Sequence, residues 1–190
     1  MLKLAKGIIT SPKETFRKAG KNDMMGEAID IFFFANIFYF IGNVIQGNFL
    51  LGISVICIGL MVWVGGSAVF SWTATKLGGR GKFRETLIVC GFAEIPLIFI
   101  GIAYMILSIS IFPKTMDFIN MPEMGVEDWI YLSILYIASL WHLVLLVIGL
   151  GEAHKITSFK AIVSIFLVPV IFIGGAIFAG AISYLFLLSL

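Results

Sequence analysis

Two ionisable side chains that could do chemistry lie inside strongly apolar stretches of the sequence. Glu94 occurs in the run GFAEIPLIF and His142 in the run YIASLWHLVLL, and a polar amide, Asn36, lies in a third run, IFFFANIFYF. An ionised group in such surroundings costs several kcal/mol unless it is paired or hydrated. These residues therefore mark either a contact between helices or a functional path.

The three polar residues are expected at about the same depth in helices that pack together. With a rise of about 1.5 Å per residue, Glu94, His142 and Asn36 each lie roughly 12 to 15 Å from the polar end of their apolar run. Small or polar residues share the helical face of each, which predicts that all three point into a bundle. We interpret them as an intramembrane polar cluster beneath a cytoplasmic pocket. The rim of this pocket is predicted to consist of Glu152, His154 and Lys155.

The cluster fits three kinds of role. The first is structural, with hydrogen bonds among Asn36, Glu94 and His142 that fix the register of the helices. The second is proton- or ion-linked transport, because intramembrane ionisable groups tend to mark pathways. The third is a metal site, whose ligand types would suit zinc although no two histidines have the i,i+4 spacing. Its weak candidate ligands are Glu94, His142, Glu152 and His154.

Motifs for catalysis are missing from the sequence. It contains neither G-x-S-x-G nor H-E-x-x-H, so we predict no enzyme, no catalytic residue and no cofactor. Cys57 and Cys90 lie in apolar runs and form neither a disulfide framework nor a metal knuckle. The stretch with Met116, Met121 and Met124 among acidic residues fits either a Cu(I) site or an amphipathic cap on the outer interface.

The composition indicates that a lipid bilayer is the solvent. Of the 190 residues, 60% are hydrophobic and 13% are charged, and the mean hydropathy is +1.06, whereas a soluble domain is about 45 to 50% apolar. The net charge of +2 is too small to indicate a nucleic-acid partner.

Five apolar stretches are long enough to cross a hydrocarbon core about 30 Å thick as helices. They cover residues 28–45, 49–75, 86–112, 129–151 and 161–190. We therefore predict an all-α integral membrane protein, with a five-transmembrane-helix bundle over residues 28–190. Residues 1–27 form a basic amphipathic segment that is expected to lie as a helix on the membrane interface.

The basic residues predict the orientation of the bundle. Twelve of the 13 Lys and Arg residues lie in the N-terminal segment or in the second and fourth connections, and these residues resist translocation. The N-terminus is therefore expected in the cytoplasm and the C-terminus outside. The second connection contains LGGRGKF, whose glycines allow a sharp turn beside anionic headgroups. Its predicted lipid-facing basic residues are Lys76, Arg80, Lys82 and Arg84.

Glycines and alanines at regular spacing predict close helix packing. Gly52, Gly59 and Gly66 recur every seven residues along one predicted helix, and Gly175 with Ala179 forms a small-xxx-small pair in another. Such stripes let helix backbones approach. They fit a homo-oligomer, a contact with related membrane proteins or packing within the monomer.

Two blocks of residues, one around the second connection and one around the fourth, together resemble a known family. The first block has Trp72, Leu77-Gly78-Gly79, Gly81, Phe83, Leu87, Gly91, Ala93 and Pro96. The second block has Trp141, Leu145, Gly149-Leu150, His154 and Lys160-Ala161, and Ser11-Pro12 with Phe16 precedes both. In order and spacing these residues resemble the Yip domain family, membrane proteins named for interaction with Ypt and Rab GTPases, in its short prokaryotic type.

The resemblance implies the same five-helix plan and a role in membrane organisation or vesicle trafficking, with membrane lipids and other membrane proteins as partners. The long cytosolic N-terminal region of eukaryotic members, with its acidic-aromatic motif, has no counterpart in residues 1–27. Docking of a small GTPase is therefore not expected. The alternative function is a small proton- or ion-linked transporter or channel that uses Glu94 and His142.

Overall fold

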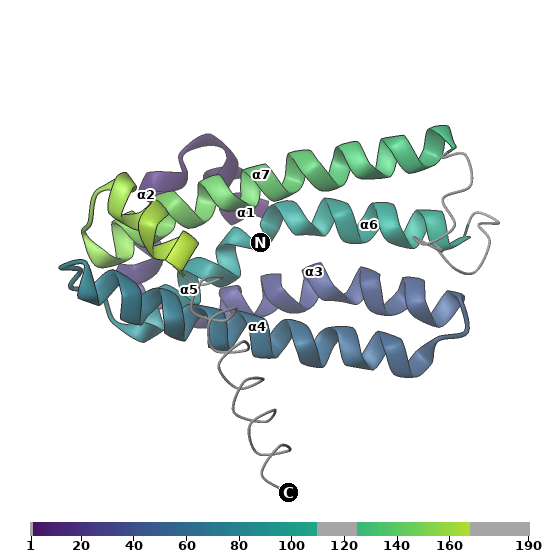
Figure 1. Ribbon diagram of the computed structural model, residues 1–190, viewed down its shortest axis with the longest axis horizontal. Coiled ribbons are helices and arrows are strands. Elements are labelled where there is room, and N and C mark those ends of the chain that lie inside the picture. The colour runs from purple at the N-terminus through teal and green to yellow at the C-terminus, as the bar shows by residue number, and fades with distance from the viewer. Residues whose placement is uncertain (1, 110–124, 168–190) are drawn as a thin grey trace, which may run out of the picture.

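The computed structural model describes residues 2–109 and 125–167, and the regular structure in this part of the chain is entirely helical (Figure 1). The helices are α1 (Leu2–Thr10), α2 (Pro12–Lys21), α3 (Met25–Ile45), α4 (Phe49–Lys76), α5 (Phe83–Ala93), α6 (Ile95–Ile109) and α7 (Val126–His154). A short apolar helix, Ser158–Leu167, follows α7. The prediction of an all-α chain is confirmed for these residues.

Three single helices, α3, α4 and α7, are long and apolar enough to cross a membrane, and α5 with α6 makes a fourth candidate span. Three predicted spans, residues 28–45, 49–75 and 129–151, fall within single helices. The fifth predicted span, residues 161–190, lies mostly outside the described residues, together with Gly175, Ala179 and the stretch with three methionines. The count of five therefore stays a prediction.

The third span is not the single helix that we expected over residues 86–112. It is broken at Glu94 into α5 and α6, which are bent by 41°. Pro96 has no N–H to donate to the carbonyl of Phe92, so the ladder of i,i+4 bonds is interrupted there. The backbone N–H of Leu97 donates instead to the carbonyl of Glu94 at 2.8 Å, which tightens the turn.

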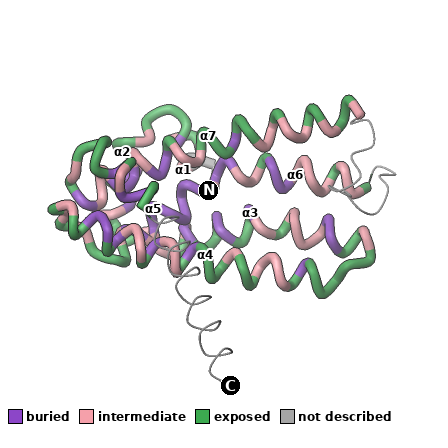
Figure 2. The backbone as a smooth tube through the Cα atoms, viewed as in Figure 1, coloured by how far each residue is buried: buried purple, intermediate pink, exposed green. Residues whose placement is uncertain are grey.

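The spans are arranged with α3 in the middle. It packs against α4 on one side and α6 on the other, and α7 lies beside α6 (Figure 1). At one end of the molecule α5 packs against α7, α4 and α3, and α2 packs against α7. Buried residues are concentrated at this end, whereas many residues of α4 and α7 are exposed away from it (Figure 2). Exposed hydrophobic helix faces are what a hydrocarbon solvent requires.

The N-terminal helices contact the bundle rather than presenting their whole apolar faces to lipid. Phe16 is 2% exposed and its ring lies 6.5 Å from that of Phe92, while Ile8 and Ala19 are fully buried. The position of this segment at the membrane interface stays a prediction, and the structure adds that α2 packs against α7 and α5. Its apolar face is covered by α5 and α7 because the large ring of Phe16 fits over the small residue Gly149.

Candidate functional site

The loop between α4 and α5 is attached to the end of α7 by a backbone hydrogen bond. The N–H of Arg80 donates to the carbonyl of His154 at 3.0 Å, and the N–H of Gly79 closes α4 by donating to Ala74 at 2.9 Å. The ammonium group of Lys160 donates to the carbonyl of Leu77 at 2.8 Å. We call residues 77–82 with Thr86, His154 and Lys160 the glycine junction.

The glycines of this junction are needed because the backbones touch. A Cβ on Gly81 would lie 2.5 Å from the carbonyl oxygen of Ala153, and one on Gly79 would lie 2.7 Å from that of Ala74. Gly78 has a φ of +92°, which favours glycine. The sequence indicated a sharp turn here, and the structure adds the contact with α7.

His154 lies inside the junction rather than on an open rim. Its side chain is fully buried, and its Nε2 lies 2.7 Å from the hydroxyl of Thr86. Among the residues that the structure describes, Nδ1 of His154 has no hydrogen-bond partner. The tautomer with the proton on Nε2 satisfies more groups, because Nε2–H then donates to Thr86 and the threonine hydroxyl donates to the carbonyl of Lys82 at 3.3 Å.

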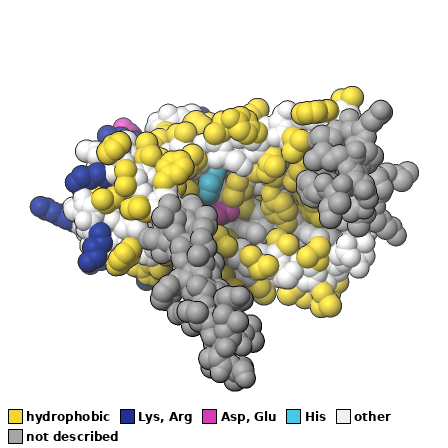
Figure 3. All heavy atoms as spheres, viewed as in Figure 1, with side chains coloured by type: hydrophobic (Ala, Val, Ile, Leu, Met, Phe, Trp, Pro, Cys, Tyr) yellow, Lys and Arg dark blue, Asp and Glu magenta, His cyan; other side chains and the backbone are white. Residues whose placement is uncertain are grey.

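The predicted basic face is exposed around this junction. Lys76, Arg80, Lys82 and Arg84 are all exposed. In the space-filling view, Lys and Arg side chains gather at the end of the molecule that holds the junction (Figure 3). Arg84 makes a two-pronged ion pair with Asp23, at 2.7 and 2.8 Å, which ties α5 to the connection between α2 and α3.

The second candidate region is the helix break at Glu94. The carbonyl of Ala93 is released from the helix ladder because Leu97 bonds to Glu94, and it accepts a hydrogen bond from Nδ1 of His142 on α7 at 2.7 Å. His142 is thereby placed next to the backbone of Glu94. Figure 3 shows a histidine and an acidic side chain side by side in the middle of the molecule, among hydrophobic side chains.

Asn36 is directed elsewhere. Its amide donates to the carbonyl of Phe32 in the same helix at 2.9 Å, and its oxygen lies against Gly59 of α4. Within residues 2–109 and 125–167, no hydrogen bond or ion pair joins Asn36, Glu94 and His142 to one another. A shared functional site of these three residues stays a prediction.

The weak metal candidates are not gathered in the described part of the chain. No group of three or more His, Cys, Asp or Glu side chains is placed there to hold a metal. Glu152 pairs with Lys155 at 3.3 Å and with Lys13 at 3.7 Å. His154 is fully buried, and its Nε2 lies against the hydroxyl of Thr86.

Comparison with known families agrees with this picture. A model of the Yip1 domain matches residues 6–186, almost the entire chain. The chain belongs to the Yip1 domain family. The searches of curated proteins and of solved structures gave no match. With its long apolar helices, this Yip1 domain protein is a multi-pass integral membrane protein.

The residues that carried the family resemblance meet in the structure of this Yip1 domain protein. Gly79 and Gly81 touch His154, and Lys160 bonds to Leu77. Gly149 is packed against Phe16 and Val89 without room for a side chain. The two blocks of residues that carry the resemblance therefore pack into one structural unit. It lies at the end of the molecule where Lys and Arg side chains gather (Figure 3), which we call the basic end.

The predicted packing stripe of α4 is used only in part. Gly52 lies against Phe40 of α3 and Gly59 against Asn36, whereas the neighbour of Gly66 is Phe70 of its own helix. Close contacts outside this stripe occur at other glycines. These are Gly42 and Gly101 between α3 and α6, Gly91 beside α3 and α4, and Gly149 between α5 and α7.

Sequence reasoning also missed Thr86, Asp23 and Trp63. The indole N–H of Trp63 donates to the carbonyl of Leu87 at 3.1 Å and its ring stacks on Phe32. A buried Trp in an apolar run usually finds such a partner, which was the available signal. Nothing in the local sequence around Thr86 or Asp23 points to partners more than 60 residues away.

Proposed function

We propose that this chain is a non-enzymatic Yip1 domain protein that organises membrane, in the manner of trafficking proteins, through helix packing and a basic cytoplasmic face. The observation that carries the proposal is the glycine junction, which holds a loop with exposed basic side chains against the end of α7. A loop fixed by buried contacts presents its charges in a constant arrangement, which a surface that recruits lipids or proteins requires.

The orientation that we propose places the glycine junction and the N-terminus in the cytoplasm and the C-terminus outside. Basic residues next to membrane spans are retained on the cytoplasmic side, and each contributes about 1 kcal/mol of attraction to an anionic surface. The clustering of Lys and Arg at one end of the molecule supports this orientation (Figure 3).

The partners that we propose are membrane lipids and other membrane proteins, including further copies of this chain. The exposed apolar faces of α4, α6 and α7 offer surfaces for such contacts within the bilayer. The proposal does not include docking of a small GTPase.

The test is reconstitution in vesicles that contain or lack anionic lipid, with lipid order and vesicle shape measured by a polarity-sensitive dye and electron cryomicroscopy. The variant carries glutamine in place of the exposed residues Lys76, Arg80 and Lys82. The control removes equal charge from exposed positions on α2 and carries Arg17→Gln, Lys18→Gln and Lys21→Gln. The loop variant is expected to lose most of the effect on anionic vesicles and the control to retain it.

Equal behaviour of the loop variant and the wild type would overturn the role of the basic face. If the wild type neither changes lipid order or vesicle shape nor associates with other membrane proteins, the proposed function as a whole is overturned.

A second candidate is a proton- or ion-linked transporter, and the broken span at Glu94 is the observation that favours it. Breaks in membrane helices free backbone carbonyls near ionisable groups, as at the ion sites of transporters. The flux of protons and ions into liposomes that hold wild type, Glu94→Gln or His142→Ala tests this function. Flux that both substitutions abolish would support transport, and no flux above that of empty liposomes would exclude it.

A further inference from the structure

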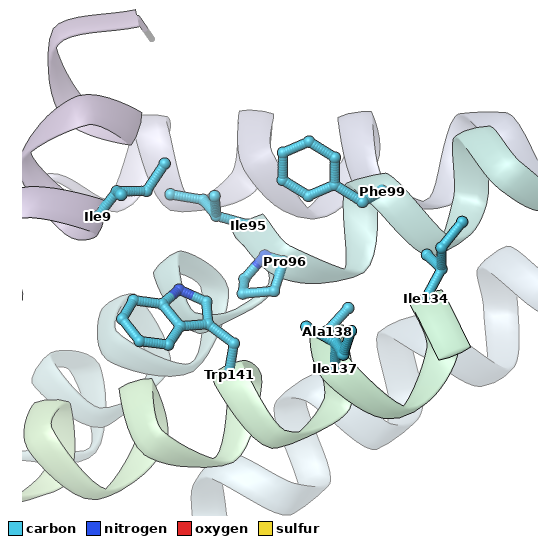
Figure 4. A pocket seen from close by; sticks show the side chains of 8 residues that line it. All are labelled: Ile9, Ile95, Pro96, Phe99, Ile134, Ile137, Ala138 and Trp141. Atoms are coloured by element: carbon cyan, nitrogen blue, oxygen red, sulfur yellow. The ribbon is translucent and has the colours of Figure 1, made fainter. Parts of the chain in front are cut away.

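A hydrophobic groove lies between α6 and α7, and the two helices and α1 provide its walls. Its volume is about 400 Å³. It is lined by Ile9, Ile95, Pro96, Phe99, Ile134, Ile137, Ala138 and Trp141 (Figure 4). All of these side chains are apolar or amphipathic, so the groove offers no strong polar group to water.

The groove opens sideways from the bundle. Phe99 is 58% exposed, Ile137 67% and Trp141 37%, although all three belong to spans that lie in hydrocarbon. An unfilled groove there would forfeit dispersion contacts along its walls. The surrounding medium supplies hydrocarbon chains, and a chain of lipid can fill such a groove without leaving a polar group unpaired.

One end of the groove is closed by α1 from the basic end of the molecule. Ile9 is 53% exposed although its neighbour Ile8 is fully buried, and its side chain lies beside that of Ile95 at this end of the groove (Figure 4). Lys6 and Lys13, which flank Ile9 along the chain, are both exposed, and the ammonium group of Lys13 also lies 3.7 Å from the carboxylate of Glu152 on α7. A hydrocarbon chain in the groove would therefore have its head end near positive charge.

The charge at the α1 end of the groove favours an anionic lipid over a second copy of the chain. The exposed charged side chains of residues 4–21 are five basic residues and one acid. They are Lys6, Lys13, Arg17, Lys18, Lys21 and Glu14. A second copy would bring the same excess of positive charge to the site, whereas an anionic headgroup is complementary to it.

We propose that the groove between α6 and α7 binds one acyl chain of an anionic phospholipid whose headgroup lies against Lys6 and Lys13. The site is separate from the glycine junction and does not require the loop between α4 and α5. It would make this Yip1 domain protein a receptor for a particular class of lipid.

Tryptophan fluorescence tests the proposal, because Trp141 forms part of the groove wall. The background protein carries Trp72→Phe and Trp129→Phe, which leaves Trp141 and Trp63. Trp63 is 6% exposed and stacked on Phe32, so it reports on the fold rather than on lipid. Quenching is measured in vesicles with equal mole fractions of phosphatidylcholine or phosphatidylglycerol brominated in the acyl chain, and Trp141→Phe in this background identifies the responsive signal.

The expected result is that brominated phosphatidylglycerol quenches Trp141 several-fold more effectively than brominated phosphatidylcholine. Lys6→Gln with Lys13→Gln is expected to remove this preference. The matched control, Lys76→Gln with Lys82→Gln in the loop, is expected to retain it. Ala138→Leu, which fills the groove with a larger apolar side chain, is expected to weaken quenching by both lipids.

Four results would overturn the proposal. Equal quenching by the two lipids would show only contact with bulk lipid. A preference that survives in the Lys6 and Lys13 variant, or that disappears in the loop control, would place the anionic lipid at another site. Absence of quenching at Trp141 would mean that protein, either residues 168–190 or a second copy, covers the groove. The loop control also separates this site from the proposed basic face.

Discussion

Replacement of Thr86 by valine tests whether the glycine junction is a stabilising unit. Valine keeps the shape of threonine but removes the hydroxyl that lies 2.7 Å from Nε2 of His154. The second ring nitrogen, Nδ1, already has no partner among the described residues, so the substitution leaves the whole imidazole without hydrogen bonds. A buried donor that loses its partner costs about 1 to 3 kcal/mol.

The expected result is therefore a loss of about 1 to 3 kcal/mol in the free energy of unfolding. The measurement is reversible unfolding in mixed micelles by titration with a denaturing detergent. The matched control is Thr75→Val, at an exposed position whose hydroxyl bonds to Ser71 within its own helix. That substitution is expected to change stability by no more than about 0.5 kcal/mol.

A second measurement distinguishes a local effect from general destabilisation. Trypsin cleaves after Arg80 and Lys82, which lie in the loop that His154 holds through the backbone N–H of Arg80. Thr86→Val is expected to speed cleavage there before the bundle unfolds. If Thr86→Val and Thr75→Val have the same stability and the same cleavage rate, the bond between Thr86 and His154 does not help to hold the loop against α7.

Three further substitutions test close contacts, each by unfolding in mixed micelles. Gly81→Ala is expected to destabilise the protein strongly because the new Cβ would lie 2.5 Å from a carbonyl oxygen. Gly65→Ala, at a position with open space around it, is expected to be neutral or stabilising. Equal effects of the two substitutions would contradict the contact at Gly81. His142→Phe removes the bond to the carbonyl of Ala93 and is expected to cost about 0.6 kcal/mol, the average for hydrogen bonds between membrane helices, and at most about 1.7 kcal/mol. No loss would mean that the bond is not formed. Gly149→Ala is expected to separate α7 from α5 and to lower stability more than Gly65→Ala does, and an equal effect would refute close packing there.

The spans could be predicted from the sequence because length and hydropathy alone define them. The predicted stretches at residues 28–45, 49–75 and 129–151 fall within α3, α4 and α7, since a helix must satisfy its own backbone in hydrocarbon. The break at Glu94 was less accessible. Proline in the first turn of a helix is compatible with both a kinked helix and the start of a new one, and only the bond from Leu97 to Glu94 decides between them.

The candidate site could be predicted only as a set of unusual residues. Depth along a helix follows from residue number, but the direction of a side chain and its partner depend on how helices rotate and cross. Asn36 bonds to its own helix and His142 bonds to a carbonyl on another, and neither outcome can be derived from spacing. Asn36 and His142, which the sequence placed at the same depth, thus bond to separate partners.

His154 shows why a position near the end of a helix does not by itself predict that a polar side chain is exposed. A histidine beside Glu152 and Lys155 would ordinarily lie at a polar surface, but a loop without side chains at Gly79 and Gly81 covers it completely. The glycines and the histidine are therefore a single feature, since a Cβ at either glycine would occupy the space of the α7 backbone or the imidazole. The family resemblance contained both halves of this contact. Its physical meaning is that the basic loop of this Yip1 domain protein is bonded to the end of α7, a candidate membrane span.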